Sequence, residues 1–237
     1  MLLNMFVLED FLSAEDRCEI DTNNELKPLI ELNNRILIFY SNVVEALSTT
    51  LDTPDAVSRF PVFLINLRIL RAFHSLSPLL KKGYYVEFNS ILRNCHESCF
   101  MSEYFIKNPD IAKDWFENPY QINRGGMMKN LEISKDFNEI YAKLCKYTHT
   151  DFETMIQSYI RLHPDSKGPE IFKILPFFDK NEAKYSLILE LFFLHYCTTQ
   201  IFHYTKQFKE IDLDFKVQWE QLHAVAEEIL RKAISKM

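Results

Sequence analysis

The sequence predicts an all-α protein, folded as a single multi-helix bundle with long helices. Apolar residues make up 47% of the 237 positions, with 20 Phe and 11 Tyr among them, so the chain can bury a large core. Only 4 Gly and 9 Pro are present, which is too few for the many tight turns of a sandwich or a barrel. Over most of the chain the apolar residues recur every three or four positions, which is the period of an α-helix.

Residues that favour helix ends set the expected boundaries in the first half of the chain. Residues 1–24 are expected to be an N-terminal extension, and the first long helix is expected to begin at Pro28, since proline suits a first turn. A second helix is expected at about 58–82 and a third at about 84–106. Gly83 separates these two helices, because glycine readily ends a helix.

The second half of the chain is expected to be helical as well, apart from one segment. Its helices are expected at about 110–117, 129–148, from Thr150 onward, 180–208 and 215–235. Residues 163–179 are the least helical stretch and are predicted to form an irregular loop, with at most a short hairpin. No linker composition interrupts the chain, so residues 1–237 are predicted to form one domain whose last two helices pack as a C-terminal hairpin.

Charge and cysteine content narrow the class of protein. The net charge is −6 with both signs interleaved, so strong nucleic-acid binding is not expected, because it rests on many Lys and Arg contacts to phosphates. The most apolar stretch, residues 187–204, contains Glu190 and His195 and is predicted to be a buried helix rather than a membrane span. The 5 cysteines lack the spacing of a disulfide framework, and the N-terminus lacks the basic start of a signal peptide. We therefore expect a cytoplasmic protein with reduced thiols.

An ion pair is expected on the third helix. Arg93 and Glu97 are four residues apart and so meet on one face of the helix. That face also carries the apolar residues Val86, Phe100 and Tyr104, which predicts that the helix packs on both sides and leaves the pair partly buried. The pair is interpreted either as structural, orienting the helix, or as part of a polar pocket that binds an anion or a small ligand.

The end of the fourth helix carries a second set of polar residues. His149 is expected to cap the last carbonyls of that helix, or alternatively to act as an acid, a base or a ligand. The spacings His96 to Cys99 and Cys145 to His149 would allow two zinc ligands from each helix. Cys99 also lies on the apolar stripe of its helix, where free cysteine is a common core residue. We therefore expect no metal, and no motif indicates a cofactor.

The same residues carry a resemblance to a known group of proteins. The run from Arg68 to Asp110 (RILRAFHSLSPLLKKGYYVEFNSILRNCHESCFMSEYFIKNPD), followed by YAKLCKYTH, resembles a widespread family of uncharacterised bacterial helical proteins. The family pattern is an R-x-x-x-E helix followed by Y-x-x-L-S-x-x-x-H. The positions that match are Arg93, Glu97, Tyr104, Tyr141, Leu144 and His149, while Cys145 stands where the family has Ser. The resemblance implies a helical fold and brings no activity with it.

A more distant similarity is to HEPN domains, which are helical bundles that include metal-independent ribonucleases. Their active sites use an Arg followed four to six residues later by a His. In this chain Lys143 or Lys146 stands where that Arg is needed before His149. The resemblance therefore implies the fold without the catalytic motif.

Two functions from different classes follow. The first is a non-catalytic binding or scaffold protein that contacts an unknown small anionic ligand or a protein partner through Arg93, Glu97, Tyr104, Tyr141 and His149. The second is a HEPN-like ribonuclease or nucleotide hydrolase in which His149 is the acid or base and Arg93 stabilises phosphate charge. The acidic net charge and the incomplete motif favour the first. Whether the chain is an enzyme, and whether it forms a homodimer, are left open.

Overall fold

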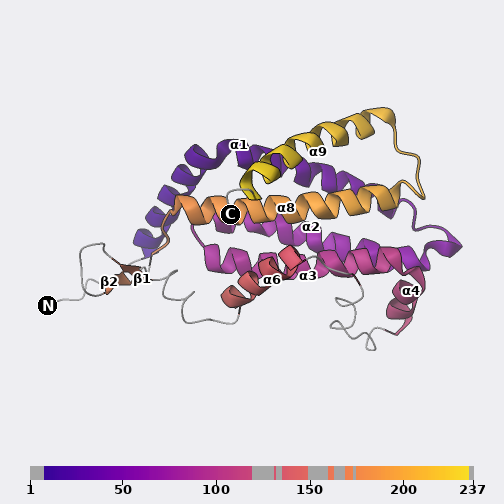
Figure 1. The fold of residues 1–237 in the computed structure, drawn as a ribbon, viewed down its shortest axis with the longest axis horizontal. Coiled ribbons are helices and arrows are strands. Elements are labelled where there is room, and N and C mark those ends of the chain that lie inside the picture. The colour runs from indigo at the N-terminus through magenta and orange to yellow at the C-terminus, as the bar shows by residue number, and fades with distance from the viewer. Residues whose placement is uncertain are drawn as a thin grey trace.

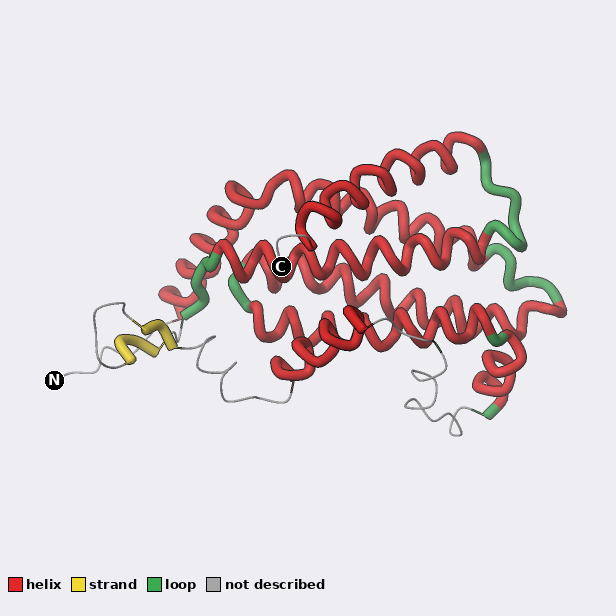
Figure 2. Tube along the Cα trace, viewed as in Figure 1, coloured by secondary structure: helices red, strands yellow, loops and turns green. Residues whose placement is uncertain are grey.

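A computed structural model describes residues 8–118, 131, 135–148, 160–162, 169–172 and 175–234. Over most of this part the chain is helical, and the long helices lie alongside one another as a bundle (Figures 1 and 2). The elements are α1 (Leu8–Ser48), η1 (Pro54–Ser58), α2 (Arg59–Lys81), α3 (Tyr85–Lys107), α4 (Pro109–Glu117), α6 (Lys135–Thr148), β1 (Ile160–Leu162), β2 (Pro169–Phe172), α8 (Lys180–Thr205) and α9 (Leu213–Ile234). The predicted all-α bundle is confirmed.

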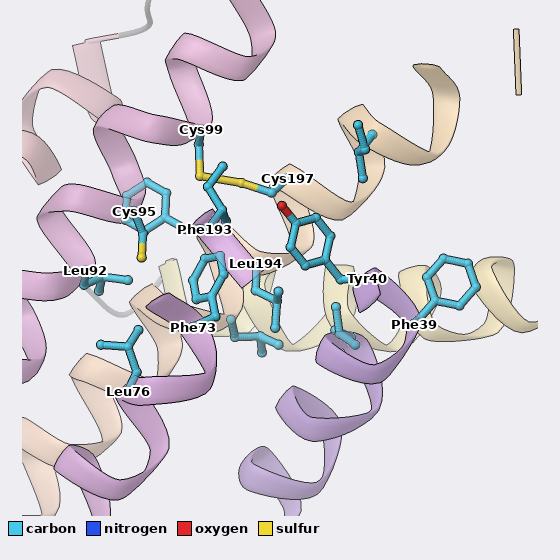
Figure 3. Packing of buried hydrophobic residues seen from close by; sticks show 14 of the residues in the cluster. Phe39, Tyr40, Phe73, Leu76, Leu92, Cys95, Cys99, Phe193, Leu194 and Cys197 are labelled. Carbon is cyan, nitrogen blue, oxygen red and sulfur yellow. A yellow bond between two sulfur atoms is a disulfide. The ribbon is translucent and has the colours of Figure 1, made fainter. Parts of the chain in front are cut away.

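Helix α8 is the centre of the bundle. It contacts α1, α2 and α3, and α9 runs back toward it at an angle and packs on it and on α1 (Figure 1). Its apolar residues surround the whole helix rather than one face, and such a helix has to be enclosed by others. The fully buried rings of Phe39, Phe73 and Phe193 lie in the resulting core (Figure 3). The predicted C-terminal hairpin of the last two helices is therefore confirmed, with α8 as its buried member.

Helix α1 begins at Leu8 and continues through Pro28, so the expected start of the first helix at Pro28 is wrong. A proline inside a helix removes one backbone hydrogen bond. Every fourth residue on one side of the N-terminal half is nevertheless buried, namely Ala14, Cys18, Thr22 and Leu26. Packing of this stripe on the rest of the bundle outweighs the local cost of the proline.

The turn between α2 and α3 holds the N-terminal half of α1 in place. Glu15 accepts a hydrogen bond from Lys82 Nζ at 2.7 Å and another from the Tyr84 hydroxyl at 2.6 Å. These two bonds lower the pKa of Glu15. Gly83 has a positive φ of 79°, and a Cβ there would lie 2.7 Å from the carbonyl oxygen of Phe177. Glycine is thus required at this turn both for its backbone angle and for its lack of a side chain.

The segment before α8 combines a hairpin with a helix cap. Strands β1 and β2 pair antiparallel, so the stretch that was expected to be irregular contains β2. Asp179 accepts hydrogen bonds from the backbone N–H groups of Asn181 and Glu182 and so caps the N-terminus of α8. The helix expected from Thr150 onward lies outside the described residues up to residue 159, and where its end was expected the structure has strand β1. Within them, no helix is both long and apolar enough to cross a membrane.

Buried polar side chains join neighbouring helices inside the core. The donor–acceptor pairs are Asn33 to Glu190 (2.8 Å), Asn89 to Ser186 (3.2 Å), Tyr40 to Asn66 (2.7 Å) and Asn66 to Ser102 (2.7 Å). A shift of one helix along another would leave one of these buried groups without its partner, which is costly. The pairs therefore fix how the helices of the bundle lie against one another.

A disulfide between Cys99 and Cys197 joins α3 to α8 (Figure 3). The expectation of reduced thiols is therefore wrong for this pair. The two residues are 98 positions apart in sequence, but their Cα atoms lie 5.9 Å apart, which suits a disulfide. Sequence spacing does not reveal a pairing that arises from two helices packed side by side.

Glu190 makes the stability of the fold depend on pH. Its side chain is 1% exposed, and burial raises its pKa to about 8 from 4.5, although the bond from Asn33 opposes this shift. Between these two pH values the unfolded chain has lost the proton that the folded protein keeps. The folded protein then binds more protons, so this residue's contribution to stability falls as the pH rises.

We expect Glu190→Gln to abolish that contribution, because Gln is neutral and can still accept from Asn33. The difference in unfolding free energy between variant and wild type should grow from pH 5 to pH 8, by up to about 1.4 kcal/mol per pH unit. Urea unfolding at each pH measures it, with Glu31→Gln at an exposed position of α1 as the control. Parallel pH profiles for Glu190→Gln and wild type would show that this carboxyl is ionised in the folded protein.

Reduction of the disulfide should destabilise the protein. A bond that closes a loop of 98 residues restricts the unfolded chain and is typically worth about 2–5 kcal/mol. A reductant should therefore lower the melting temperature of the wild type. It should leave a Cys99→Ser, Cys197→Ser double variant unchanged, and Cys145→Ser, which keeps the disulfide, should respond like the wild type. Equal melting of reduced and oxidised wild type would contradict a stabilising disulfide.

Candidate functional site

Arg93 is the centre of a polar cluster between α3 and α6. Its Nη2 donates to Glu97 Oε1 at 2.8 Å and to the Tyr141 hydroxyl at 2.9 Å. The same hydroxyl donates to Glu97 Oε1 at 2.8 Å, and Arg93 Nε donates to Cys145 Sγ at 3.3 Å. The predicted contact between Arg93 and Glu97 is thus confirmed. We call these four residues the Arg93 cluster.

Matching spacings on the two helices build this cluster. Arg93 and Glu97 are four residues apart on α3, and Tyr141 and Cys145 are four residues apart on α6. Each pair therefore lies on one face of its own helix, and the two faces meet. The guanidinium carbon of Arg93 also lies 5.3 Å from the centre of the Tyr141 ring, which adds a cation–π contact. The cluster holds α6 against α3 through hydrogen bonds and a cation–π contact.

Below the cluster, the buried ring of His96 supports Tyr141. The two rings lie almost parallel, with centroids 5.1 Å apart and planes at 24°. The rings of Phe100 and Phe193 pack on the same imidazole in T-shaped geometry, with centroids 4.6 and 4.9 Å from its centroid. His96 is 0% exposed, so it belongs to the packing between α3, α6 and α8. The stacking on His96 fixes the position of the Tyr141 ring beside the guanidinium of Arg93.

Burial and charge make Arg93 a permanent cation. Its side chain is 16% exposed and that of Glu97 is 33% exposed, so Arg93 is largely buried while Glu97 reaches solvent. Burial by itself would lower the pKa of Arg93. The hydrogen bonds to Cys145 and Tyr141, together with the charge of Glu97, outweigh burial and raise that pKa. Burial also raises the pKa of Tyr141, so its hydroxyl keeps the proton that it donates.

One residue predicted for the site is not part of this cluster. Tyr104 is buried two turns beyond Glu97 on α3, about 10 Å along the helix axis, and no hydrogen bond within the described residues joins it to the cluster. His149 follows the last residue of α6 and lies outside the described residues.

Cys145 was considered as a metal ligand and as a substitute for Ser. Its spacing of four from Tyr141 was the signal for its actual place beside Arg93.

The zinc hypothesis finds no support in the geometry. Cys99 is bonded to Cys197, and His96 is enclosed by aromatic rings. Within the described residues, no group of three or more His, Cys, Asp and Glu side chains is placed to hold a metal ion. Among the described residues, the cluster therefore offers a guanidinium and hydrogen-bonding groups and no set of metal ligands.

Comparison with known proteins confirms the resemblance to an uncharacterised family. Residues 60–124 match the model of a family of unknown function (DUF5677). The match spans α2, α3 and α4 and includes Arg93, Glu97 and Tyr104, while Tyr141 and Cys145 lie beyond it. No curated protein and no solved structure matches the chain. The similarity to HEPN domains stays a prediction.

We expect Glu97→Ala to destabilise the protein by about 1–3 kcal/mol. The substitution removes two hydrogen bonds to a carboxylate and leaves a largely buried guanidinium without its counter-charge, but partial exposure of Glu97 keeps the cost below that of a fully buried pair. Chemical unfolding measures the loss, with Glu87→Ala at an exposed position of α3 as the matched control. A change within about 0.5 kcal/mol, equal to the control, would mean that water replaces the carboxylate without cost.

Proposed function

We propose that the protein is a non-catalytic helical binding protein that holds a small anionic ligand at the Arg93 cluster. The observation that carries the proposal is the arrangement of the guanidinium, which donates to acceptors from two helices while remaining 16% exposed. A cation that neighbouring side chains hold in one orientation loses little further freedom when an anion binds. Such preorganisation is characteristic of binding sites.

The N–H groups on Nη1 of Arg93 support the choice of an anion as the ligand. Arg93 uses Nε and Nη2 for Cys145, Tyr141 and Glu97, and Nη1 has no hydrogen-bond partner among the described residues. A carboxylate or phosphate oxygen can accept from a guanidinium N–H in a charge-assisted hydrogen bond. Tyr141 offers an aromatic surface beside it. The ligand class that fits is therefore a small molecule with one anionic group.

The charge balance of the cluster favours binding over catalysis. Stabilising a phosphoryl transition state requires positive charge that is available where negative charge develops. Glu97 lies 2.8 Å from Arg93 and compensates part of that charge already in the unliganded protein, which leaves the N–H groups of Nη1 for a bound anion but little net charge for a transition state. An acid or base from His149 would lie outside the described residues. Within the described part of the site, the carboxylate of Glu97 and the hydroxyl of Tyr141 are hydrogen-bonded to each other and to Arg93, which supports recognition rather than proton transfer.

The test is calorimetric titration of the purified protein with inorganic phosphate and with adenosine monophosphate. We expect saturable binding of at least one of them, weakened about tenfold or more in Arg93→Gln, because a hydrogen bond from a charged donor is worth about 1.5–3 kcal/mol. Arg71→Gln, at an exposed position of α2, is the matched control and should bind like the wild type. Circular dichroism establishes that the variants are equally helical.

Three results would overturn the proposal. If neither anion binds, or if Arg93→Gln binds as the wild type does, the cluster is structural only. Labelled single-stranded RNA in excess chelator tests the ribonuclease alternative. Cleavage by the wild type that is lost in both Arg93→Gln and His149→Ala would replace binding by catalysis as the function of this cluster.

A further inference from the structure

A second site lies where α9 packs on α8, and neither helix contributes to the Arg93 cluster. A groove of about 500 Å³ opens between the two helices, which is within the usual size range of small-molecule sites. Its apolar walls are Phe192 and Tyr196 of α8 and Leu230 of α9. One side of each helix lines it, because the wall residues recur at helical spacing.

The floor of the groove is a hydrogen-bonded pair of histidines. His195 Nε2 lies 2.7 Å from His223 Nδ1, with ring centroids 4.8 Å apart and planes at 21°, so the rings meet edge to edge. The His195 ring also packs in parallel on Trp219. Burial, with the charge of His223 as a second cause, lowers the pKa of His195 to about 4. His195 is therefore neutral at pH 7, and its Nε2 forms a hydrogen bond with His223 Nδ1.

The neighbouring carboxylate of Glu227 favours a proton on one nitrogen of the His223 ring. Glu227 Oε1 faces the other nitrogen of His223, Nε2, at 3.9 Å. An acceptor on that side favours a proton on Nε2 of His223. The two histidines thus direct an N–H group of His223 toward the carboxylate.

The remaining distance is too long for a direct hydrogen bond. An N–H···O bond spans about 2.7–3.2 Å, against 3.9 Å here. One oxygen atom placed beside both groups can accept from His223 Nε2–H and donate its own proton to Glu227. A hydroxyl group has this combination of one donor and free acceptor positions.

We propose that this groove binds a small neutral molecule with an apolar body and one hydroxyl group, such as a phenol. The hydroxyl bridges His223 and Glu227, and the body lies between Phe192, Tyr196 and Leu230. Apolar walls with a few convergent polar groups at one end are the usual composition of such sites. The polar pair orients the molecule and the walls supply most of the affinity.

Charged ligands and metal ions suit the groove less well. An anion would meet the carboxylate of Glu227. A cation would compete with Arg231, which already lies 3.7 Å from that carboxylate. A tetrahedral metal ion bound by both histidines needs their nitrogens roughly 3.3 Å apart, from metal–nitrogen bonds of 2.0–2.1 Å. They are 2.7 Å apart and point at each other, which is the geometry of a hydrogen bond.

The experiment compares 4-ethylphenol with ethylbenzene, which has a similar apolar body and no hydroxyl. We expect the wild type to bind 4-ethylphenol at least about tenfold more tightly, by calorimetry, since a hydrogen bond to a charged acceptor is worth about 1.5–3 kcal/mol. Glu227→Met keeps the size of the side chain and removes the acceptor, so the preference should fall to about threefold or less. Glu228→Met, the next position on α9, is the matched control and should keep the preference.

Nuclear magnetic resonance of the histidine rings locates the ligand. Added 4-ethylphenol should shift the ring signals of His223 and His195 and leave those of His74, an exposed residue of α2, unchanged. The proposal is overturned if 4-ethylphenol does not bind, if ethylbenzene binds equally well, if the preference survives in Glu227→Met, or if the two histidine signals do not move. These results do not depend on whether the Arg93 cluster binds anions.

Discussion

The enclosure of α8 is the constraint on which the rest of the structure depends. A helix that is apolar on all sides loses stability wherever it meets water, so other helices must cover it. Helices α1, α2 and α3 do so along most of its length, and α9 packs on it at an angle (Figure 1). Every other feature follows from where these helices can lie. The disulfide from Cys197 and the aromatic contacts of Phe193 both start from α8.

Polar groups within this apolar interior give the packing its specificity. Burial of apolar area is not directional, so it allows helices to slide along one another at modest cost. The pairs Asn33–Glu190 and Asn89–Ser186 allow one arrangement of α8 against α1 and α3, because each buried group loses its partner in any other. Glu190 occupies this place as a neutral carboxylic acid, since burial disfavours its charged form.

The two sites show opposite uses of polar side chains at the edge of the same core. At the Arg93 cluster the guanidinium keeps its charge, because Glu97, Tyr141 and Cys145 surround it with acceptors. In the groove between α8 and α9, burial keeps His195 neutral, and it forms a hydrogen bond with His223. We propose an anion as the ligand of the first arrangement and a neutral hydroxyl group as that of the second. Both depend on helices that the core has already placed.

Local features of this protein follow from the sequence, while contacts between helices needed the tertiary structure. Helical periodicity, the glycine at position 83 and the cap at Asp179 act within a few residues, so the sequence by itself determined most helix ends in the described part. The pairing of Arg93 with Glu97 was predictable because four residues separate them on one helix. Pro28 misled the prediction, since packing of the buried stripe of α1 outweighs a local preference.

The remaining contacts join residues far apart in the chain. Tyr141 and Cys145 reach Arg93 from another helix, and Cys99 reaches Cys197 across 98 positions. His195 was predicted to be a core residue, and only the packing of α9 on α8 brings His223 to it. Which faces of two helices meet depends on how all the side chains between them pack together. No single stretch of sequence contains that information, so tertiary packing decided both sites.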